Sequence, residues 1–401
     1  MKRNRAVCCA LACLLCLTGL AGCAKEEPAF ILGMDASAVP SLEAGGVQYY
    51  SREGQQQDVF QILADAGINY IRVRVWNHPF DEAGRGYGGG NCDIRNAVEI
   101  GKRATRYGMK LMVDFHYSDF WADPGKQMAP LAWKDMDLQQ KTNALYAFTC
   151  ESLTALKTAG VSVGMVQLGN ETNGGLAGET RWEAMAKLFS AGAKAVRDTL
   201  PDALVAVHFT NPEKPGAYAY YSGQLAQYAV DYDVFATSYY PLWHGSLENL
   251  QTVLNTVKET YGKQVLVAET AHPYTAVDLD FHPNTVTGDS QTPYPMTPEG
   301  QAAWVKAVAD AVYHIGGMGL FYWEGTWIPA GGRSYEENRK LWETYGSGWA
   351  SSYAGRYDPQ DAGKYYGGCA VENQAFFDGR GTALDSLEVF SRIRRELGNL
   401  R

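Results

Sequence analysis

Eight short apolar segments alternate with stretches of helical periodicity along the chain, and this alternation constrains the fold more than any other feature. The segments span residues 30–35, 68–76, 110–117, 163–171, 203–210, 234–240, 264–270 and 319–327. Most are continuous apolar runs, which are typical of parallel strands buried on both faces. Together with the intervening helices they predict an α/β protein, a single (β/α)8 TIM barrel over residues 30–401. The alternative is a doubly wound open sheet, which would need a phosphate-binding first turn that the first strand lacks.

The connections between these segments differ in length. One helical stripe contains Leu247, Leu254 and Val257, with Ser246 placed to cap its beginning and Gly262 to end it. Two other connections are long, residues 270–297 after the seventh strand and residues 328 to about 384 after the eighth. Because active sites of barrels form at the carboxyl ends of the strands, we expect these two loops to shape the site.

The N-terminus has the pattern of an export signal. Lys2, Arg3 and Arg5 precede an apolar stretch, residues 6–17, which is too short to span a bilayer as a permanent helix. Residues 20–23, Leu-Ala-Gly-Cys, look like a bacterial lipobox, so we expect a signal peptide over 1–22, lipidation of Cys23 and a tether over 23–29. This predicts a secreted protein, anchored by lipid at the bacterial cell surface. An ordinary secretory signal or a retained apolar anchor is the alternative.

Charge and cysteine content exclude several classes of protein. The net charge is −9, and removal of the three basic leader residues would make it −12. Without a basic stripe we expect no nucleic-acid partner, and an acidic protein suits a neutral glycan better than a polyanion. After removal of the signal peptide and use of Cys23 for lipid, Cys92, Cys150 and Cys369 remain, which allows at most one disulfide and leaves its existence open. We expect a monomer.

Two glutamates stand at the ends of apolar strands. Glu171 ends the fourth segment and Glu269 precedes the last residue of the seventh. A carboxylate in such a place is costly unless it has a purpose, and both would point into the mouth of the barrel. Two facing carboxyl groups are what glycoside cleavage requires, one to protonate the leaving oxygen and one to attack the anomeric carbon. The alternative for each is a salt bridge at the rim.

Other strand ends also carry polar or aromatic residues. They are Asp35, Arg72, Arg74, Asp114, His116, Tyr239, Tyr240, Trp323 and Glu324. A Trp at the floor of the mouth can stack on a sugar ring, and a Tyr or Arg beside a nucleophile can keep it ionised. Each of these residues alone is more often structural, so the prediction depends on their joint placement.

Six segments, in this order, resemble glycoside hydrolase family 53, the endo-β-1,4-galactanases. They are GMDAS at 33–37, RVRVW at 72–76, DFHYSDFWADP at 114–124, GNE at 169–171, SYYP at 238–241 and ET at 269–270. The resemblance implies a retaining enzyme that hydrolyses β-1,4-galactan, with Glu171 as acid/base and Glu269 as nucleophile. The expected substrate-binding residues are Arg72, Asp114, His116, Trp121, Asn170, Tyr239, Tyr240 and Trp323. The rival hypotheses are another barrel glycanase, such as a mannanase or endoglucanase, and a surface lipoprotein that captures glycans without cutting them.

The loop after the seventh strand also predicts a metal site. Asp278, Asp280, His282 and Asn284 alternate along it, and hard oxygen ligands at such spacing suit calcium. The resemblance implies that His282 offers its backbone carbonyl. It also implies a carbonyl from Cys369 and a carboxylate from Glu372, where Ser and Asp are usual, so the longer Glu372 would have to retract slightly. The alternatives are a polar turn without metal and, on one imidazole, a weak case for zinc.

Overall fold

The computed structural model describes residues 29–332 and 334–399. The predicted signal peptide, the lipidation site Cys23 and all but the last residue of the tether lie outside the described residues. Within the described ranges, no helix is both long and apolar enough to cross a membrane.

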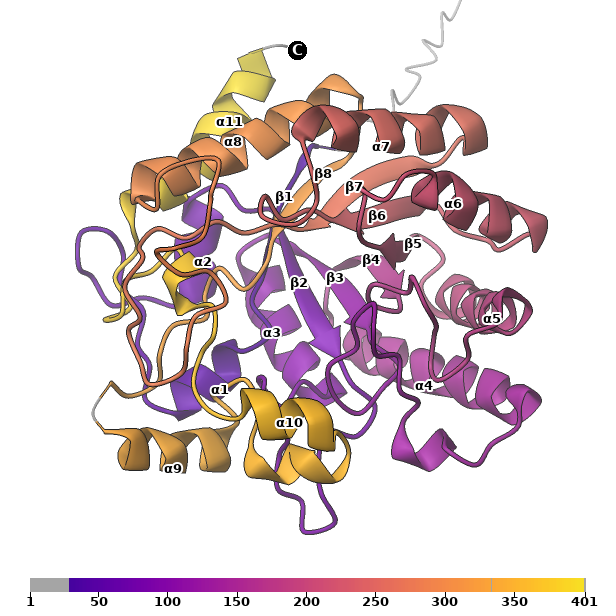
Figure 1. Ribbon diagram of the computed structural model, residues 1–401, viewed down its shortest axis with the longest axis horizontal. Helices are drawn as coiled ribbons and strands as arrows, with labels where there is room; N and C mark the ends of the chain where they lie inside the picture. Colours follow the sequence, from indigo (N-terminus) through magenta and orange to yellow (C-terminus); the bar gives the residue numbers. More distant parts are fainter. Residues whose placement is uncertain (1–28, 333, 400–401) are drawn as a thin grey trace, which may run out of the picture.

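Eight parallel strands form a closed barrel in sequence order, with β1 paired to β8 (Figure 1). The strands are β1 Ile31–Asp35, β2 Tyr70–Val75, β3 Lys110–Phe115, β4 Val163–Leu168, β5 Leu204–Phe209, β6 Val234–Ser238, β7 Gln264–Glu269 and β8 Gly319–Tyr322. Nearly all of their residues are buried, as continuous apolar runs require. The predicted (β/α)8 barrel is confirmed.

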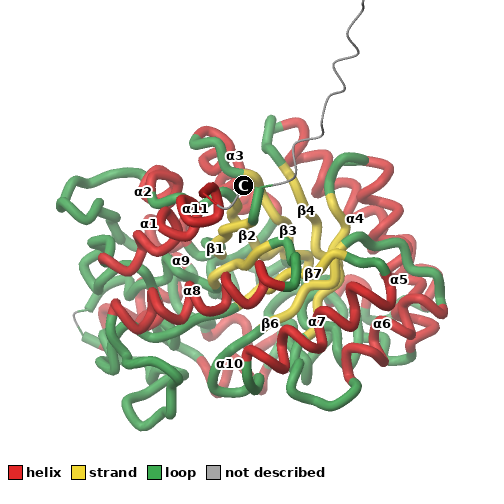
Figure 2. Tube along the Cα trace, turned by 90° about the horizontal axis from the view of Figure 1, so that it is seen from above, coloured by secondary structure: helices red, strands yellow, loops and turns green. Residues whose placement is uncertain are grey.

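Helices surround the barrel, and Figure 2 shows them outside the strands. They are α1 Val39–Ala44, α2 Val59–Asp65, α3 Ile94–Arg106, α4 Leu138–Thr158, α5 Trp182–Thr199, α6 Ala217–Gln227, α7 Leu247–Tyr261, α8 Pro298–His314, α9 Tyr335–Tyr345, α10 Pro359–Tyr365 and α11 Val389–Asn399. The predicted signals around α7 are present: the Ser246 side chain accepts a hydrogen bond from the Asn249 amide, and Gly262 ends the helix with a positive φ.

The barrel interior changes from apolar to charged along its axis. Met112, Met165, Leu266 and Phe321 belong to one buried cluster contributed by the strands. Phe321 lies so close to Gly33 that a Cβ there would stand 2.2 Å from its ring, so this position requires glycine. Nearer the carboxyl ends of the strands, ionic side chains replace the apolar ones. The charged side chains therefore lie at the mouth of the barrel.

Several strands end earlier than the sequence predicted. β3, β4 and β8 stop at Phe115, Leu168 and Tyr322, whereas the apolar segments continue to 117, 171 and 327. The backbone turns at these ends, with positive φ at Tyr117, Glu171 and Glu324. A non-glycine residue in this region is uncommon and costs energy, so its repeated use at one end of the barrel marks the functional face.

The two predicted long loops are present and contact each other. Residues 270–297 contain no helix or strand, whereas the excursion after β8 contains α9 and α10, which lie at the lower edge of the molecule in Figure 1. The Tyr274 amide donates to the Asn373 carbonyl at 2.8 Å, and the Thr285 amide donates to the Ala370 carbonyl at 2.8 Å. These bonds join segments about ninety residues apart and form one wall of the barrel mouth.

Candidate active site

Glu171 and Glu269 line the same cleft at the mouth of the barrel, which has a volume of about 500 Å³. Glu269 is the last residue of β7, whereas Glu171 lies three residues beyond the end of β4, on a backbone with φ +46°. The cleft is lined by Arg74, His116, Trp121, Ala122, Asp123, Asn170, Glu171, Tyr240, Trp243, Glu269, Thr285, Trp323, Trp349, Tyr365, Ala370, Val371 and Gln374.

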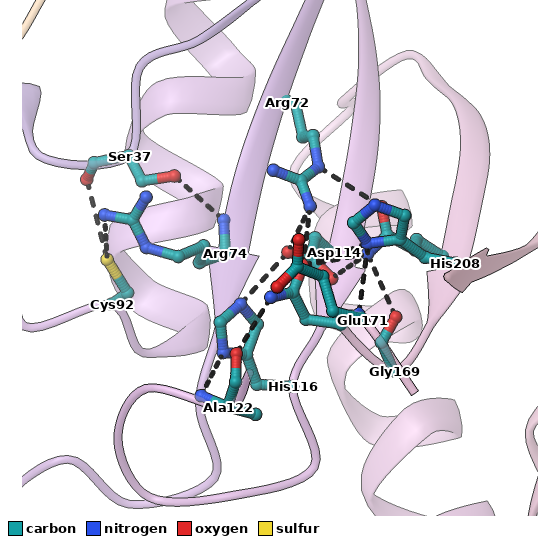
Figure 3. Close-up of polar contacts among 12 residues, drawn as sticks. Ser37, Arg72, Arg74, Cys92, Asp114, His116, Ala122, Gly169, Glu171 and His208 are labelled. Carbon is teal, nitrogen blue, oxygen red and sulfur yellow. Dashed lines mark hydrogen bonds and ion pairs between the residues drawn. The ribbon is translucent and has the colours of Figure 1, made fainter. Parts of the chain in front are cut away.

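Arg72 of β2 is the buried cation beneath this pair. Its Nη2 lies 2.8 Å from the carboxylate of Asp114 and 2.8 Å from that of Glu269, and its Nη1 lies 3.1 Å from Asp35; Figure 3 shows its position beside Asp114. Burial lowers the pKa of Arg72, but the three carboxylates more than offset this, so the guanidinium stays charged. Arg72 therefore fixes the orientation of Glu269 and neutralises part of its charge.

Glu269 is held in the form that a nucleophile requires. Its Oε1 forms an ion pair with Arg72, and its Oε2 accepts a hydrogen bond from the Tyr240 hydroxyl at 2.9 Å. Burial raises the pKa of Glu269 above its usual value, and Arg72 and Tyr240 offset part of this rise because both favour the ionised carboxylate. A group with two donors on its two oxygens is the member of the pair that carries the negative charge.

Glu171 is held in the opposite form. Burial and, after it, the charge of Glu269 raise the pKa of the Glu171 side chain to about 8. A hydrogen bond from Ser238 and the more distant Arg72 lower it, but without cancelling the rise. Glu171 thus keeps a proton at neutral pH beside an ionised Glu269. Two carboxyl groups in such unequal surroundings, one with donors on both oxygens and one without, suit a nucleophile and an acid.

His208 on β5 fixes the backbone at Glu171, and our sequence analysis did not select it. The Glu171 amide donates to His208 Nδ1 at 3.2 Å (Figure 3). The proton of the ring therefore lies on Nε2, which is 3.0 Å from the Ser238 hydroxyl. Burial places the pKa of His208 well below its usual value, so the ring is neutral. The available signal was a histidine inside a buried apolar strand, which needs polar partners.

Asn170 and His116 hold the segment that follows β3. Asn170 donates to the Ala122 carbonyl at 2.8 Å, and its Oδ1 accepts from Arg72 at 3.0 Å. The Ala122 amide donates to His116 Nδ1 at 3.1 Å, so Nε2 of His116 donates to Asp114 at 3.1 Å (Figure 3). The loop that carries Trp121 is therefore tied to the same charged group that orients Glu269.

Aromatic rings from the connections after β3 and β8 cover one side of the cleft. Trp121 is 8% exposed, lies 4.6 Å from the ring of Trp349 at an interplanar angle of 15°, and has the Arg74 guanidinium 4.3 Å from its centroid. Trp323 contacts both rings, and Tyr365 contacts Trp349. The sequence analysis selected Trp121 and Trp323 but missed Trp349 and Tyr365, which lie within the long excursion after β8.

The structure brings most of the expected substrate-binding residues together. His116, Trp121, Asn170, Tyr240 and Trp323 line the cleft, while Arg72 and Asp114 lie beneath it, fully buried. Tyr239 lies elsewhere: its ring stacks on Trp304 at 5.6 Å and its hydroxyl donates to the Gly245 carbonyl at 2.8 Å. The structure therefore places Tyr239 outside the cleft lining.

Three carboxylates of the predicted metal site meet between the two long loops. One oxygen each of Asp278, Asp280 and Glu372 lies within 4.8 Å of the others. The side-chain amide of Asn284 donates to Glu372 Oε1 at 2.9 Å, and the backbone amide of Cys369 donates to Asp280 Oδ2 at 2.7 Å. Among the described residues, Asn284 Oδ1 and Glu372 Oε2 are buried oxygens without a hydrogen-bond partner. Such a set of oxygens fits a hard cation such as calcium.

The cysteines of the described chain form no disulfide with one another. Cys92 and Cys369 are buried and Cys150 is partly buried, each with a free thiol. The question that the sequence left open is thus answered for these three residues.

A comparison with protein families shows to which family the whole barrel is related. The sequence model of glycosyl hydrolase family 53 matches residues 31–390. The chain belongs to glycosyl hydrolase family 53. The match extends from β1 into α11, so every strand of the barrel and both long loops belong to the family domain.

Relatives from several organisms share most of its length. An endo-β-1,4-galactanase of Bacillus subtilis is 56% identical over 365 residues, 90% of this chain and 85% of the relative. An arabinogalactan endo-β-1,4-galactanase of Cellvibrio japonicus is 33% identical over 349 residues, 83% of this chain and 90% of the relative. The structure of a family 53 catalytic domain from Ignisphaera aggregans superposes with a TM-score of 0.80 at 35% identity, covering 92% of this chain and 98% of that one.

Proposed function

We propose that this family 53 protein is an endo-acting β-1,4-galactanase that cleaves with retention of configuration. Relatives named as galactanases cover most of the chain, and the cleft holds two carboxyl groups in unequal environments. The observation that carries the mechanism is the unequal environment of this pair: Glu269 has donors on both oxygens, whereas burial and the charge of Glu269 keep Glu171 protonated.

The two carboxyl groups would act together in a reaction of two steps. Glu171 donates its proton to the glycosidic oxygen while Glu269 Oε attacks the anomeric carbon, which releases the leaving sugar and forms a galactosyl ester on Glu269. Water then attacks the same carbon as Glu171 removes its proton, and the ester bond breaks. Two inversions give net retention. This chemistry requires the carboxyl groups to be about 5–5.5 Å apart, whereas inversion needs about 6.5–9.5 Å.

The stereochemistry of azide products tests the two roles separately. With an activated aryl β-galactobioside, Glu269→Ala has no nucleophile, so azide should attack the open face and give an inverted glycosyl azide. In Glu171→Ala the first step should survive, the galactosyl ester should accumulate, and azide should release it with retained configuration. Glu183→Ala, an exposed carboxylate on α5, is the control and should behave as wild type.

Two results would reject this assignment. One is the same azide configuration from both variants, and the other is full activity on galactan in either of them. The wild-type enzyme should also be assayed on galactan, mannan and cellulose. Cleavage of mannan or cellulose in preference to galactan would favour the rival glycanases, and binding without cleavage would favour the glycan-capturing protein.

We further propose that calcium binds between the loops after β7 and β8. The support is the convergence of Asp278, Asp280 and Glu372, together with the partnerless buried oxygens of Asn284 and Glu372. Backbone carbonyls of His282 and Cys369 would complete the set, as the family resemblance implies. The cation would neutralise like charges that otherwise repel and would hold the two loops together. It would have no part in the bond-breaking steps.

The sequence alone supports a lipid anchor. Cys23 follows a basic and apolar leader at the position of a lipobox cysteine, and we propose that it carries the acyl chains that hold the enzyme at the cell surface. An enzyme that acts on a polymer outside the cell needs such export. A monomer remains our expectation.

A further inference from the structure

One exposed aromatic residue of the cleft has no role in the proposal above. Trp243, in the loop between β6 and α7, is 49% exposed and lines the same cleft as Glu171 and Glu269. A large ring left half in water inside a cleft is an unusual use of apolar surface, because burial of such a ring is one of the larger favourable contributions to folding. The position therefore suggests a surface that another molecule covers.

The loop holds this ring in a defined place. The amides of Trp243 and His244 both donate to the Tyr240 carbonyl, at 3.2 and 3.1 Å, and the Tyr240 amide donates to His244 Nδ1 at 3.0 Å. The ring of Trp243 stands edge-on to that of Tyr240, with centroids 5.6 Å apart, and the Tyr240 hydroxyl bonds to Glu269. Trp243 is thus one ring away from the proposed nucleophile, on a turn fixed by three hydrogen bonds.

Trp243 comes from the side of the cleft that carries the proposed acid. The Ser238 hydroxyl at the end of β6 hydrogen-bonds to Glu171 and also contacts His208, which accepts from the Glu171 amide. Trp243 follows Ser238 by five residues, so the loop leaves the barrel beside Glu171. In contrast, Trp323, Trp349 and Tyr365 all follow β8, and their ring contacts are with one another and with Trp121 and Trp327. The cleft therefore has separate aromatic surfaces on the β6 and β8 sides.

The acid identifies which sugar each surface would meet. Glu171 must reach the glycosidic oxygen, which departs with the leaving group, so the leaving sugar lies toward Glu171 and the sugar that forms the ester lies on the other side. A β-galactosyl ring has an axial 4-hydroxyl on one face, which leaves a continuous patch of C–H groups on the opposite face. Such a patch can stack on an indole ring.

We infer that Trp243 is the stacking surface for the galactosyl unit on the leaving-group side, and that it binds both the departing chain and any sugar that accepts the galactosyl group in place of water. The inference rests on the proposed galactanase activity and extends it to the acceptor. In the transfer step the bond between Glu269 and the anomeric carbon breaks, a bond to the acceptor oxygen forms, and the acceptor's hydroxyl proton passes to Glu171. Atoms and charge balance as in hydrolysis.

The ratio of transfer to hydrolysis tests this role. The donor is 2,4-dinitrophenyl β-galactobioside and the acceptor is β-1,4-galactobiose, with dinitrophenolate release giving total turnover and product separation giving the ratio. Loss of one stacked ring should lower the ratio about tenfold in Trp243→Ala, and kcat/KM on galactan should fall by about the same factor. Trp243→Phe should recover most of the ratio. Tyr228→Ala, an exposed ring at the end of α6 that does not line the cleft, should match wild type.

The outcomes separate this inference from the proposed function. If the wild-type enzyme releases no dinitrophenolate, the proposed function is refuted. The inference that Trp243 binds a galactosyl unit is then refuted as well. An active wild type with a normal ratio in Trp243→Ala refutes only the inference. A parallel loss of transfer and hydrolysis in that variant, with no change of ratio, would likewise reject acceptor binding, because damage to the loop lowers both rates alike.

Discussion

Removal of the Tyr240 hydroxyl should narrow the pH range of activity from its acidic side. In Tyr240→Phe, Glu269 loses the hydrogen bond that Oε2 accepts at 2.9 Å but keeps the ion pair with Arg72. A hydrogen bond to a charged group contributes about 1.5–3 kcal/mol, and one pKa unit corresponds to about 1.36 kcal/mol. Because the lost bond favours the ionised form, the pKa of Glu269 should rise by about one to two units.

The assay is kcat/KM for dinitrophenyl β-galactobioside measured across pH. The acidic limb reports ionisation of the free nucleophile and should move upward by about one to two units. The alkaline limb reports loss of the proton from Glu171, whose pKa is raised to about 8, and should remain near that pH because Glu269 is ionised there in both enzymes. Tyr239→Phe is the matched control, since the Tyr239 hydroxyl bonds to Gly245 outside the cleft lining. An acidic limb that stays in place in Tyr240→Phe, or moves equally in the control, would refute the reasoning.

Two further predictions concern the metal and the anchor. Chelation should lower the melting temperature and calcium should restore it, since an ion at a hundred times its Kd adds about 2.7 kcal/mol to the free energy of unfolding. Glu372→Gln should weaken this response and Glu336→Gln, on the exposed surface of α9, should not; no effect of chelation, with no ion found by elemental analysis, would contradict the site. Wild-type protein made in a bacterial host should partition into detergent and Cys23→Ser into water, while Cys16→Ser, within the leader, should still partition into detergent; aqueous wild-type protein would exclude the anchor.

The order of strands and helices could be predicted because it depends on patterns that the chain repeats eight times. The strand ends could not, because they depend on backbone conformation. Tyr117 and Glu324 adopt positive φ, which no propensity of these residue types indicates. Glu171 was expected at the end of a strand, but it lies on a turn beyond β4, and this turn brings its amide to His208.

The residues of the candidate site were also predictable only in part. The charged residues at strand ends were predictable, since a buried charge inside an apolar run needs a partner. The choice between Tyr239 and Tyr240 was not: neighbouring residues at a strand end point in opposite directions, and the sequence does not say which faces the mouth. Trp243 and Trp349 lie in loops and Tyr365 ends the short helix α10, so no periodicity indicates that these rings will line the cleft.

Burial is the larger cause of the raised pKa of Glu171, and the charge of Glu269 is the second; this second cause has a consequence for the later half of the proposed reaction. Once Glu269 becomes an ester it is neutral, so Glu171 loses a repulsive neighbour while Arg72 stays in place. The proton affinity of Glu171 therefore falls just after it has given its proton away. The lower affinity favours the ionised carboxylate, which can then take a proton from water. When water breaks the ester, the returning charge restores the affinity. One electrostatic contact would thus let the same side chain alternate between acid and base at a constant external pH.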